Sequence, residues 1–239
     1  MGAAVDRCLQ WCRDPRTPRT VITANAAILC MMRRDAELRQ ACRDGDLVVA
    51  DGMSVVWTSR LAGRPFPERV AGVDMMARLL EGASAHGLRV YFLGARREVV
   101  EELVRRCARD FPHLVVAGFR DGYFGREAHA DVIEDIRRAA PHMLFVGMPT
   151  PFKEIWCERH REALDVPVIM GVGGSFDVLA GYVRRAPPML QALGLEWGWR
   201  LLMEPRKMWK RYLVTNAQYL WLAAGEILKR RAGLARPAH

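Results

Sequence analysis

Pro167-Val168-Ile169-Met170-Gly171-Val172-Gly173-Gly174-Ser175-Phe176-Asp177 is the stretch that decides the fold. Its first four residues are apolar and uninterrupted, which is typical of a strand buried on both faces of a parallel sheet. The glycine turn that follows, with a helix expected after it, would let backbone N–H groups approach a phosphate. Because the spacing is not G-x-G-x-x-G, a tight turn required only by packing fits these residues equally well.

Similar apolar runs, each predicted to be a strand, alternate along the chain with amphipathic stretches. The other strands are expected at Thr20–Thr23, Leu47–Ala50, Arg89–Leu93 and Met143–Val146, with a weaker one at Leu114–Ala117. Helices are expected at Ala3–Cys12, Ala26–Cys42, Asp74–His86, Glu98–Asp110, Ala128–Ala139 and Phe152–Leu164. This alternation predicts an α/β protein whose parallel sheet carries helices on its faces.

Ligands of such sheets bind beyond the carboxyl ends of the strands. Small and polar residues gather directly after the predicted strands, at Thr23-Ala24-Asn25, Asp51-Gly52, Gly94-Ala95-Arg96, Asp121-Gly122-Tyr123-Phe124 and Gly147-Met148-Pro149. Their joint occurrence at one edge is more informative than any one of them. We therefore expect the functional site at this edge.

Asp51 is the sharpest catalytic candidate, because a carboxylate at the ligand edge can act as a general base. Taken alone, it fits better as the N-cap of a helix starting near Met53. Asp44-Gly45-Asp46 has the D-x-D form of a metal clamp but precedes its strand, and we interpret it as a turn. A nucleotide-sugar enzyme without that clamp needs another cation for its diphosphate leaving group, and arginine or lysine can fill that role.

Two further features have competing interpretations. Tyr123 and Phe124 could stack on a nucleotide base, although aromatic residues at a loop more often fill a core. The six cysteines form no C-x-x-C pair, and the histidines are scattered. We expect reduced, apolar cysteines in a reducing compartment and no metal site.

The end of the chain differs from the rest in charge. From Tyr182 to His239 there are eleven lysines and arginines against three glutamates, a balance of +8 in a chain whose net charge is +9. Four of the seven tryptophans lie there as well. We therefore expect an α/β core at residues 1–185 and a basic, amphipathic helical appendage at residues 186–239.

The appendage has separate polar and apolar faces. After Pro205, cations at 206, 207, 210 and 211 share one helix face, and Met208, Trp209, Tyr212 and Leu213 lie about 200° away. An apolar stripe follows at Leu220, Trp221, Ala224, Ile227 and Leu228.

The longest charge-free run has only fourteen residues, whereas a membrane span needs about 20. With no signal peptide evident, these features predict a cytoplasmic protein that docks on an anionic membrane surface. The apolar stripe is also consistent with packing of the appendage against the α/β core, or against a second copy of the chain in a homo-oligomer.

Several motifs, in one order, carry a family resemblance: Thr23-Ala24-Asn25, Ala50–Val56, Arg69–Asp74, Asp121–Phe124, Gly171–Asp177, and Gly194–Trp197 through Arg200 to Glu204-Pro205-Arg206. From about Val21 to Leu222 the chain resembles the WecG/TagA/CpsF glycosyltransferases, glycosyltransferase family 26. These enzymes transfer a sugar from a nucleotide donor to a polyprenyl-diphosphate-linked acceptor. The resemblance implies a Rossmann-like core, an inverting, metal-independent reaction without a cofactor, and a role in cell-envelope or exopolysaccharide synthesis.

The resemblance also implies roles for particular residues. It raises Asp51 from a helix cap to the catalytic base, with Thr23 and Asn25 lining the same pocket. The nucleotide of a UDP-sugar donor would contact Gly94, Gly122, Tyr123, Gly173, Gly174 and Asp177. Substrate would also meet Lys153 and Glu154. In the appendage, Arg200 would meet the acceptor diphosphate, together with Arg206, Lys207, Lys210 and Arg211.

The chain departs from the family pattern in two places. It opens near its first helix, where the family usually has a strand or hairpin beforehand. A Pro-Lys-Gln-Glu motif appears as Pro151-Phe152-Lys153-Glu154, so that lysine replaces glutamine. The extra charge motivates the hypothesis that a substrate sugar is acidic, for example a hexuronate.

Two other classes of function fit parts of the sequence. A basic tail could grip nucleic acid, but the aromatic residues lie opposite the cations and no nucleic-acid motif occurs, so we expect no nucleic-acid partner. A nicotinamide-dependent oxidoreductase could use a similar sheet, but the full glycine fingerprint is absent, as is the acidic residue expected at the end of the next strand. A comparison of binding to nucleic acid with binding to lipid vesicles tests the first class. A change in the fluorescence of an added nicotinamide cofactor tests the second.

Overall fold

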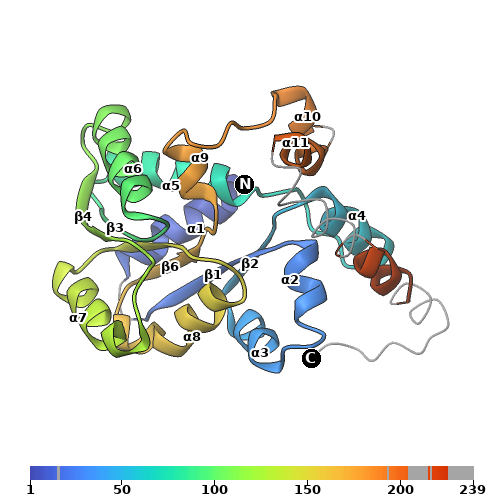
Figure 1. Ribbon diagram of the computed structural model, residues 1–239, viewed down its shortest axis with the longest axis horizontal. Coiled ribbons are helices and arrows are strands. Elements are labelled where there is room, and N and C mark those ends of the chain that lie inside the picture. The colour runs from blue at the N-terminus through green and yellow to red at the C-terminus, as the bar shows by residue number, and fades with distance from the viewer. Residues whose placement is uncertain (15–16, 193, 204–214, 216, 226–239) are drawn as a thin grey trace. The chain divides into compact units, whose positions relative to one another are not determined.

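The computed structural model describes residues 1–14, 17–192, 194–203, 215 and 217–225. These residues belong to two compact units (Figure 1). The first, called the sheet unit, contains Met1–Thr23, Glu37–Val49 and Val70–Arg184. The second unit combines Ala24–Ala36 and Ala50–Arg69 with the part of the chain that begins at Arg185.

One six-stranded sheet organises the fold, with strand order β2-β1-β6-β5-β3-β4. Each pairing in the series β1, β6, β5, β3, β4 is parallel. The strands are β1 (Arg19–Ala24), β2 (Leu47–Ala50), β3 (Arg89–Gly94), β4 (Val115–Arg120), β5 (Met143–Gly147) and β6 (Val168–Gly171). The central strands β5 and β6 are almost completely buried, which explains why their sequences are continuously apolar.

Four helices pack together on one face of the sheet (Figure 1). They are α1 (Gly2–Arg13), α5 (Gly72–Ala85), α6 (Arg97–Asp110) and α9 (Ser175–Leu179). Their apolar stripes share a core with the side chains of the strands, and its centre is an aromatic group in which Phe92 stacks on Phe145 and meets the edge of Phe176. This core fixes α9, and with it the glycine turn that precedes that helix.

The opposite face carries α3 (Ala36–Asp44), α7 (His129–Ala139) and α8 (Phe152–Leu164) (Figure 1). A single turn of 3-10 helix, Arg126–Ala128, leads into α7. Trp156, Cys157 and Leu164 of α8 join Val132 and Ile136 of α7 in a second core against the sheet. An ion pair between Arg159 and Glu37 links α8 to α3. The helices on both faces confirm the predicted Rossmann-like α/β arrangement.

The second unit is built around α2 (Ala26–Met31) and α4 (Met53–Leu61). It also holds α10 (Pro188–Ala192), α11 (Glu196–Met203) and a helical segment at 217–225. Tyr219 of that segment is buried in a small core with Cys30, Val55 and Val56. Its hydroxyl hydrogen-bonds the Thr58 hydroxyl and donates to the carbonyl of Ser54 at 3.3 Å. Residues near the end of the chain therefore complete the core around α4.

The prediction of one long helix at Ala26–Cys42 is wrong, because the chain forms α2 and α3 with a turn at 32–34 between them. Backbone bonds at the turn are short-range, with Arg33 N–H donating to Cys30 O and Arg34 N–H to Met31 O. The two helices also bury their apolar residues in different units: Ile28 and Cys30 lie in α2, and Leu38 and Cys42 in α3.

Among the helices of the described residues, none is both long enough and apolar enough to cross a membrane. The helix expected after Pro205, with its cationic and apolar faces, lies outside the described residues. So do Ile227 and Leu228 of the predicted apolar stripe. The proposed boundary between residues 185 and 186 stays a prediction.

Candidate active site

Glycines at the ends of β3 and β5 bring three backbone segments into close contact. Gly94 pairs with Gly147 across the strands, and a Cβ on Gly94 would lie 2.5 Å from the carbonyl carbon of Gly147. Ala95 N–H donates to Gly147 O, and Gly122 N–H donates to Ala95 O, both at 2.9 Å. A Cβ on Gly122 would also meet Gly94, at 3.0 Å from its Cα. Because these glycines have no side chains, backbone atoms form this part of the sheet edge.

The glycine turn after β6 is anchored to the same edge. Val172 N–H donates to Val146 O at 2.9 Å, and the Gly173 N–H lies 3.4 Å from the same carbonyl. Gly173 has φ +53, a left-handed conformation that glycine adopts without a steric penalty. The Phe176 ring lies where a Cβ on Gly147 would be. The turn is thus fixed from both sides, with Gly174 leading directly into α9.

Tyr123 and Phe124 have different environments. Tyr123 is 77% exposed, and its N–H donates to Asp121 Oδ1 at 3.0 Å. Phe124 instead packs edge-on against His129 and Trp156, with Arg120 over its ring. Of the two aromatic candidates, only Tyr123 has a ring available for stacking, whereas Phe124 fills a core. Asp177 lies half-buried in the first turn of α9.

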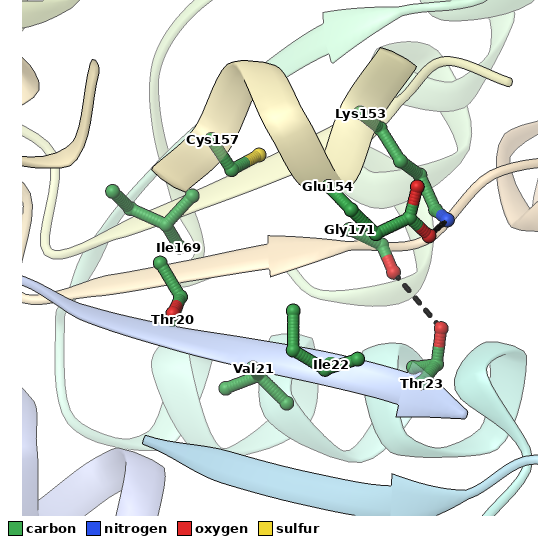
Figure 2. A pocket seen from close by; sticks show the side chains of 9 residues that line it. All are labelled: Thr20, Val21, Ile22, Thr23, Lys153, Glu154, Cys157, Ile169 and Gly171. Atoms are coloured by element: carbon green, nitrogen blue, oxygen red, sulfur yellow. Dashed lines mark hydrogen bonds and ion pairs between the residues drawn. The ribbon is translucent and has the colours of Figure 1, made fainter. Parts of the chain in front are cut away.

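Thr23, Lys153 and Glu154 come together between β1, β6 and α8 (Figure 2). The Thr23 hydroxyl donates to Gly171 O at 3.2 Å and so joins the ends of β1 and β6. A Cβ on Gly171 would lie 3.3 Å from Cδ and Cε of Lys153. The lysine side chain therefore extends beneath the glycine turn, close to the position that the sequence predicted for substrate contacts.

Lys153 and Glu154 form a buried ion pair, with side chains only 5% and 3% exposed. The Lys153 ammonium donates to Glu154 Oε1 and, at 2.7 Å, to the Thr150 hydroxyl. That hydroxyl donates in turn to Glu154 Oε1 at 3.0 Å. Glu154 Oε2 is buried without a hydrogen-bond partner in the structure. The charge of Lys153 is thus compensated inside the protein, which argues against a direct role in binding an acidic sugar.

The cavity bordered by these residues has a volume of about 10 Å³. Holding even one water molecule takes about 10–15 Å³. The cavity is too small for a sugar, so Lys153 and Glu154 support the wall of a site rather than lining a formed sugar pocket in this conformation.

Asp51 and Asn25 are neighbours within the second unit. Asp51 follows β2 directly, and its N–H donates to Ala24 O at 2.8 Å. The alternative that Asp51 caps α4 is wrong, because Gly52, with φ +153, occupies the N-cap position. Asn25 caps α2, where its Oδ1 accepts from Ile28 N–H at 3.1 Å. The half-buried Asp51 carboxyl is therefore placed at the end of its strand by backbone geometry.

The appendage residues expected to bind diphosphate are described only in part. Arg200 lies in α11, and its side chain is outside the description. Arg206, Lys207, Lys210 and Arg211 all lie outside the described residues. Sequence reasoning missed Arg69, which lies at the end of the second segment of the second unit and pairs with Glu196 in α11. Both residues occur in the motifs noted above, but their pairing left no signal in the sequence.

Within the described part of the chain, no cluster of three or more histidines, cysteines or carboxylates is suited to a metal. Asp46 accepts a hydrogen bond from Thr20 N–H and pairs with Arg161, and Asp44 accepts from Gln40. The Asp44-Gly45-Asp46 sequence is thus the connection between α3 and β2, as predicted. Burial raises the pKa of the Cys8 and Cys12 thiols to about 12, which fits the interpretation of the cysteines as apolar core residues.

Ligands of open α/β sheets bind beyond the carboxyl ends of the strands, and in the sheet unit these ends are lined by the glycines of β3, β5 and the turn after β6. The chain belongs to the glycosyl transferase WecG/TagA/CpsF family, whose model matches residues 1–233. This membership confirms the resemblance noted in the sequence and makes the protein a glycosyltransferase.

Two relatives are named N-acetylglucosaminyldiphosphoundecaprenol N-acetyl-β-D-mannosaminyltransferase. The one from Bacillus spizizenii strain W23 is 36% identical over 193 residues, which cover 81% of this chain and 74% of the relative. The one from Bacillus subtilis strain 168 is 32% identical over 200 residues, covering 84% and 77% respectively.

Proposed function

We propose that the protein transfers a sugar, with inversion, from a UDP-sugar to a saccharide carried on a polyprenyl diphosphate, in cell-envelope or exopolysaccharide synthesis. The observation that carries the proposal is Asp51, whose carboxyl is half-buried at a strand end and is not used as a helix cap. The names of the relatives, which specify a diphosphoundecaprenol-linked acceptor, support the acceptor class.

In this mechanism Asp51 removes the proton from the acceptor hydroxyl as that oxygen attacks the anomeric carbon. The bond from the anomeric carbon to the UDP oxygen breaks as the new glycosidic bond forms, so a single displacement inverts the configuration. A sugar hydroxyl is a weak nucleophile at neutral pH, and a positioned base typically contributes about 10²–10⁴-fold in rate.

The departing diphosphate needs positive charge. Arginine and lysine can supply it in place of a divalent ion, and we assign this part to Arg200, Arg206, Lys207, Lys210 and Arg211, which also hold the diphosphate of the acceptor. No metal or cofactor enters the mechanism. Retained turnover in excess EDTA is the expected result, and a strict requirement for magnesium or manganese would contradict this step.

For the donor, we assign the nucleotide to the backbone at Gly94, Gly122, Gly173 and Gly174, with Asp177 nearby in α9. Tyr123 offers an exposed ring to the uracil base. Thr23 and the Lys153–Glu154 pair support the sugar end of this site. Because Glu154 compensates the Lys153 charge, we propose a neutral or N-acetylated donor sugar in preference to a uronic one.

We further propose that the enzyme works as a peripheral protein on an anionic membrane. In the second unit, Trp57 and Leu61 are 51% and 63% exposed at i, i+4 on α4. Arg60 of α4 and Arg64, three residues after the end of this helix, are exposed as well. Tryptophan and leucine flanked by arginines is the composition of an interfacial membrane contact. Trp221, 76% exposed, adds to the apolar surface of this unit.

A donor screen tests the function directly. UDP release would be measured with a series of UDP-sugars, each with and without a synthetic prenyl-diphosphate-linked saccharide. We expect acceptor-dependent release with neutral or N-acetylated donors and a product of inverted anomeric configuration. A preference for UDP-hexuronates would contradict the donor assignment. UDP release that is the same with and without the lipid-linked acceptor would contradict the proposed function.

A further inference from the structure

Glu196, in the first turn of α11, receives two arginines from separate parts of the second unit. The Arg69 guanidinium donates to Glu196 Oε2 through Nη2. Arg185 approaches Glu196 Oε1 from the segment before α10, with Nε at 3.6 Å. The side chains of Arg69 and Glu196 are only 15% and 28% exposed. This contact is therefore shielded from solvent more than an ordinary surface ion pair, which contributes little.

Arg69 also holds the end of α10. Its Nη1 donates to Gln191 O at 3.1 Å, while the Gln191 side chain donates to Ala186 O at 2.6 Å. A single guanidinium thus bridges the last turn of α10 and the first turn of α11. The planar fork of arginine, with its several donors, suits this double contact, and a lysine at this position could not reproduce it.

The turn between these helices is packed against α4. Gly194 has φ +71, and a Cβ there would lie 2.6 Å from Cγ of Met53. Met53 begins α4, two residues after Asp51. The N-terminal end of α11 is therefore held in two ways. Gly194 contacts α4, the helix that follows the proposed catalytic base, and Arg69 bridges α10 and α11.

We infer that Arg69 is a positioning residue that acts through Glu196. Arg200 follows Glu196 by four residues, about one turn along the backbone of α11. By holding Glu196, Arg69 sets the direction of α11 and hence the place of the cation that binds the acceptor diphosphate. This inference rests on the proposed function, in which Arg200 contacts that diphosphate. The rival explanation is that Arg69 itself binds a substrate phosphate.

A double-mutant cycle separates these two explanations. The variants are Arg69→Gln, Glu196→Gln and the double variant, with Arg69→Lys as the conservative change. Arg105→Gln, on the surface of α6, is the matched control, because the ion pair of Arg105 among the described residues is with its neighbour Glu102. The readouts are KM for the lipid acceptor, kcat, and equilibrium binding of UDP.

If Arg69 acts through Glu196, each single variant raises KM for the acceptor on the order of 10-fold and leaves UDP binding unchanged. The double variant is then also about 10-fold impaired, and Arg69→Lys falls between the wild type and Arg69→Gln. About 100-fold impairment of the double variant, weaker UDP binding in Arg69→Gln, or no effect of either single variant overturns the inference.

Hydrogen exchange of the amides of residues 196–203 gives a readout that does not depend on turnover. We expect faster exchange in both single variants and no further increase in the double variant. Unchanged exchange overturns the inference even if activity falls. A wild-type enzyme that transfers no sugar refutes the proposed function, while the exchange data still decide whether Arg69 positions α11.

Discussion

At the residue scale, Asp51 carries the chemistry of the proposal. Asp51→Asn keeps the size of the side chain and removes the base, so turnover should fall about 10²–10⁴-fold. UDP binding and the unfolding midpoint should stay close to those of the wild type, since the N-cap of α4 is Gly52. Initial rates of UDP release and a thermal melt measure both. Near-normal turnover removes Asp51 from the mechanism.

The buried Lys153–Glu154 pair should be sensitive to removal of either partner. Glu154→Gln leaves an ammonium inside the protein without its counter-charge, which typically costs about 3–5 kcal/mol of unfolding free energy. Replacing both, with Lys153→Met and Glu154→Gln together, removes the uncompensated charge and should recover part of that loss. Urea unfolding of the three proteins measures the difference. A double variant less stable than Glu154→Gln alone contradicts this account of the pair.

Individual residues were predictable where the chain itself supplies the context. Asp51 and the glycines follow apolar runs, and the place of such residues at a sheet edge follows from the α/β pattern. The Arg69–Glu196 pair was not predictable, because 127 residues separate its members and no local period connects them. The compensation of Lys153 by its immediate neighbour was likewise missed, since adjacent residues on a helix do not normally face each other.

At the scale of elements, the close approach of β3 and β5 depends on Gly94. Gly94→Ala forces a methyl group against the Gly147 backbone, and overpacking of this kind costs about 1–3 kcal/mol beyond the backbone strain. Gly63→Ala is the matched control, because Gly63 also has positive φ but open space at its Cβ position. We expect Gly94→Ala to lose more unfolding free energy and to weaken UDP binding. Equal losses in the two variants would mean that the contact is unimportant.

The cysteines of α1 should be unreactive in the folded protein. Burial raises the pKa of Cys8 and of Cys12 to about 12, so at pH 8 both are thiols rather than the nucleophilic thiolates. Iodoacetamide at pH 8 should leave both unmodified in buffer and alkylate them in denaturant, as mass spectrometry of tryptic peptides would reveal. Rapid labelling in buffer contradicts their burial.

Strands and helices were predictable to within a few residues because their apolar periods are set locally. The exception, Ala26–Cys42, has a helical period along its whole length. The break into α2 and α3 depends on which unit each half packs against, and that is a property of the tertiary structure.

At the scale of the whole molecule, the proposed membrane contact predicts a response to both salt and apolar substitution. Binding to vesicles with anionic lipid should weaken as salt rises, because each lysine or arginine near the surface contributes about 1 kcal/mol by electrostatics. Trp57→Ser with Leu61→Ser should weaken it further, in a flotation assay. Phe119→Ser, at an exposed position of β4, is the control expected to have no effect. Equal binding by both variants contradicts a contact through α4.

The division of the chain was predicted from charge, which changes sharply near residue 182. The predicted boundary stays a prediction, and the structure adds that Ala24–Ala36 and Ala50–Arg69 group with the part of the chain that begins at Arg185. Those two segments have no unusual composition, so nothing in the sequence could identify them. Composition reports where the charge lies along the chain, whereas the grouping depends on contacts such as that of Tyr219 with Thr58.

The burial of Tyr219 has a consequence for how the protein is made. Thr58 and Tyr219 are 161 residues apart, and a ribosome adding about 5–20 residues per second takes roughly 8–30 s to synthesise the chain between them. Throughout that interval Cys30, Val55 and Val56 lack their aromatic partner, so nascent chains expose an apolar surface that includes residues soon after the proposed catalytic base. Translation must therefore pass Tyr219 before the core around α4 can be completed.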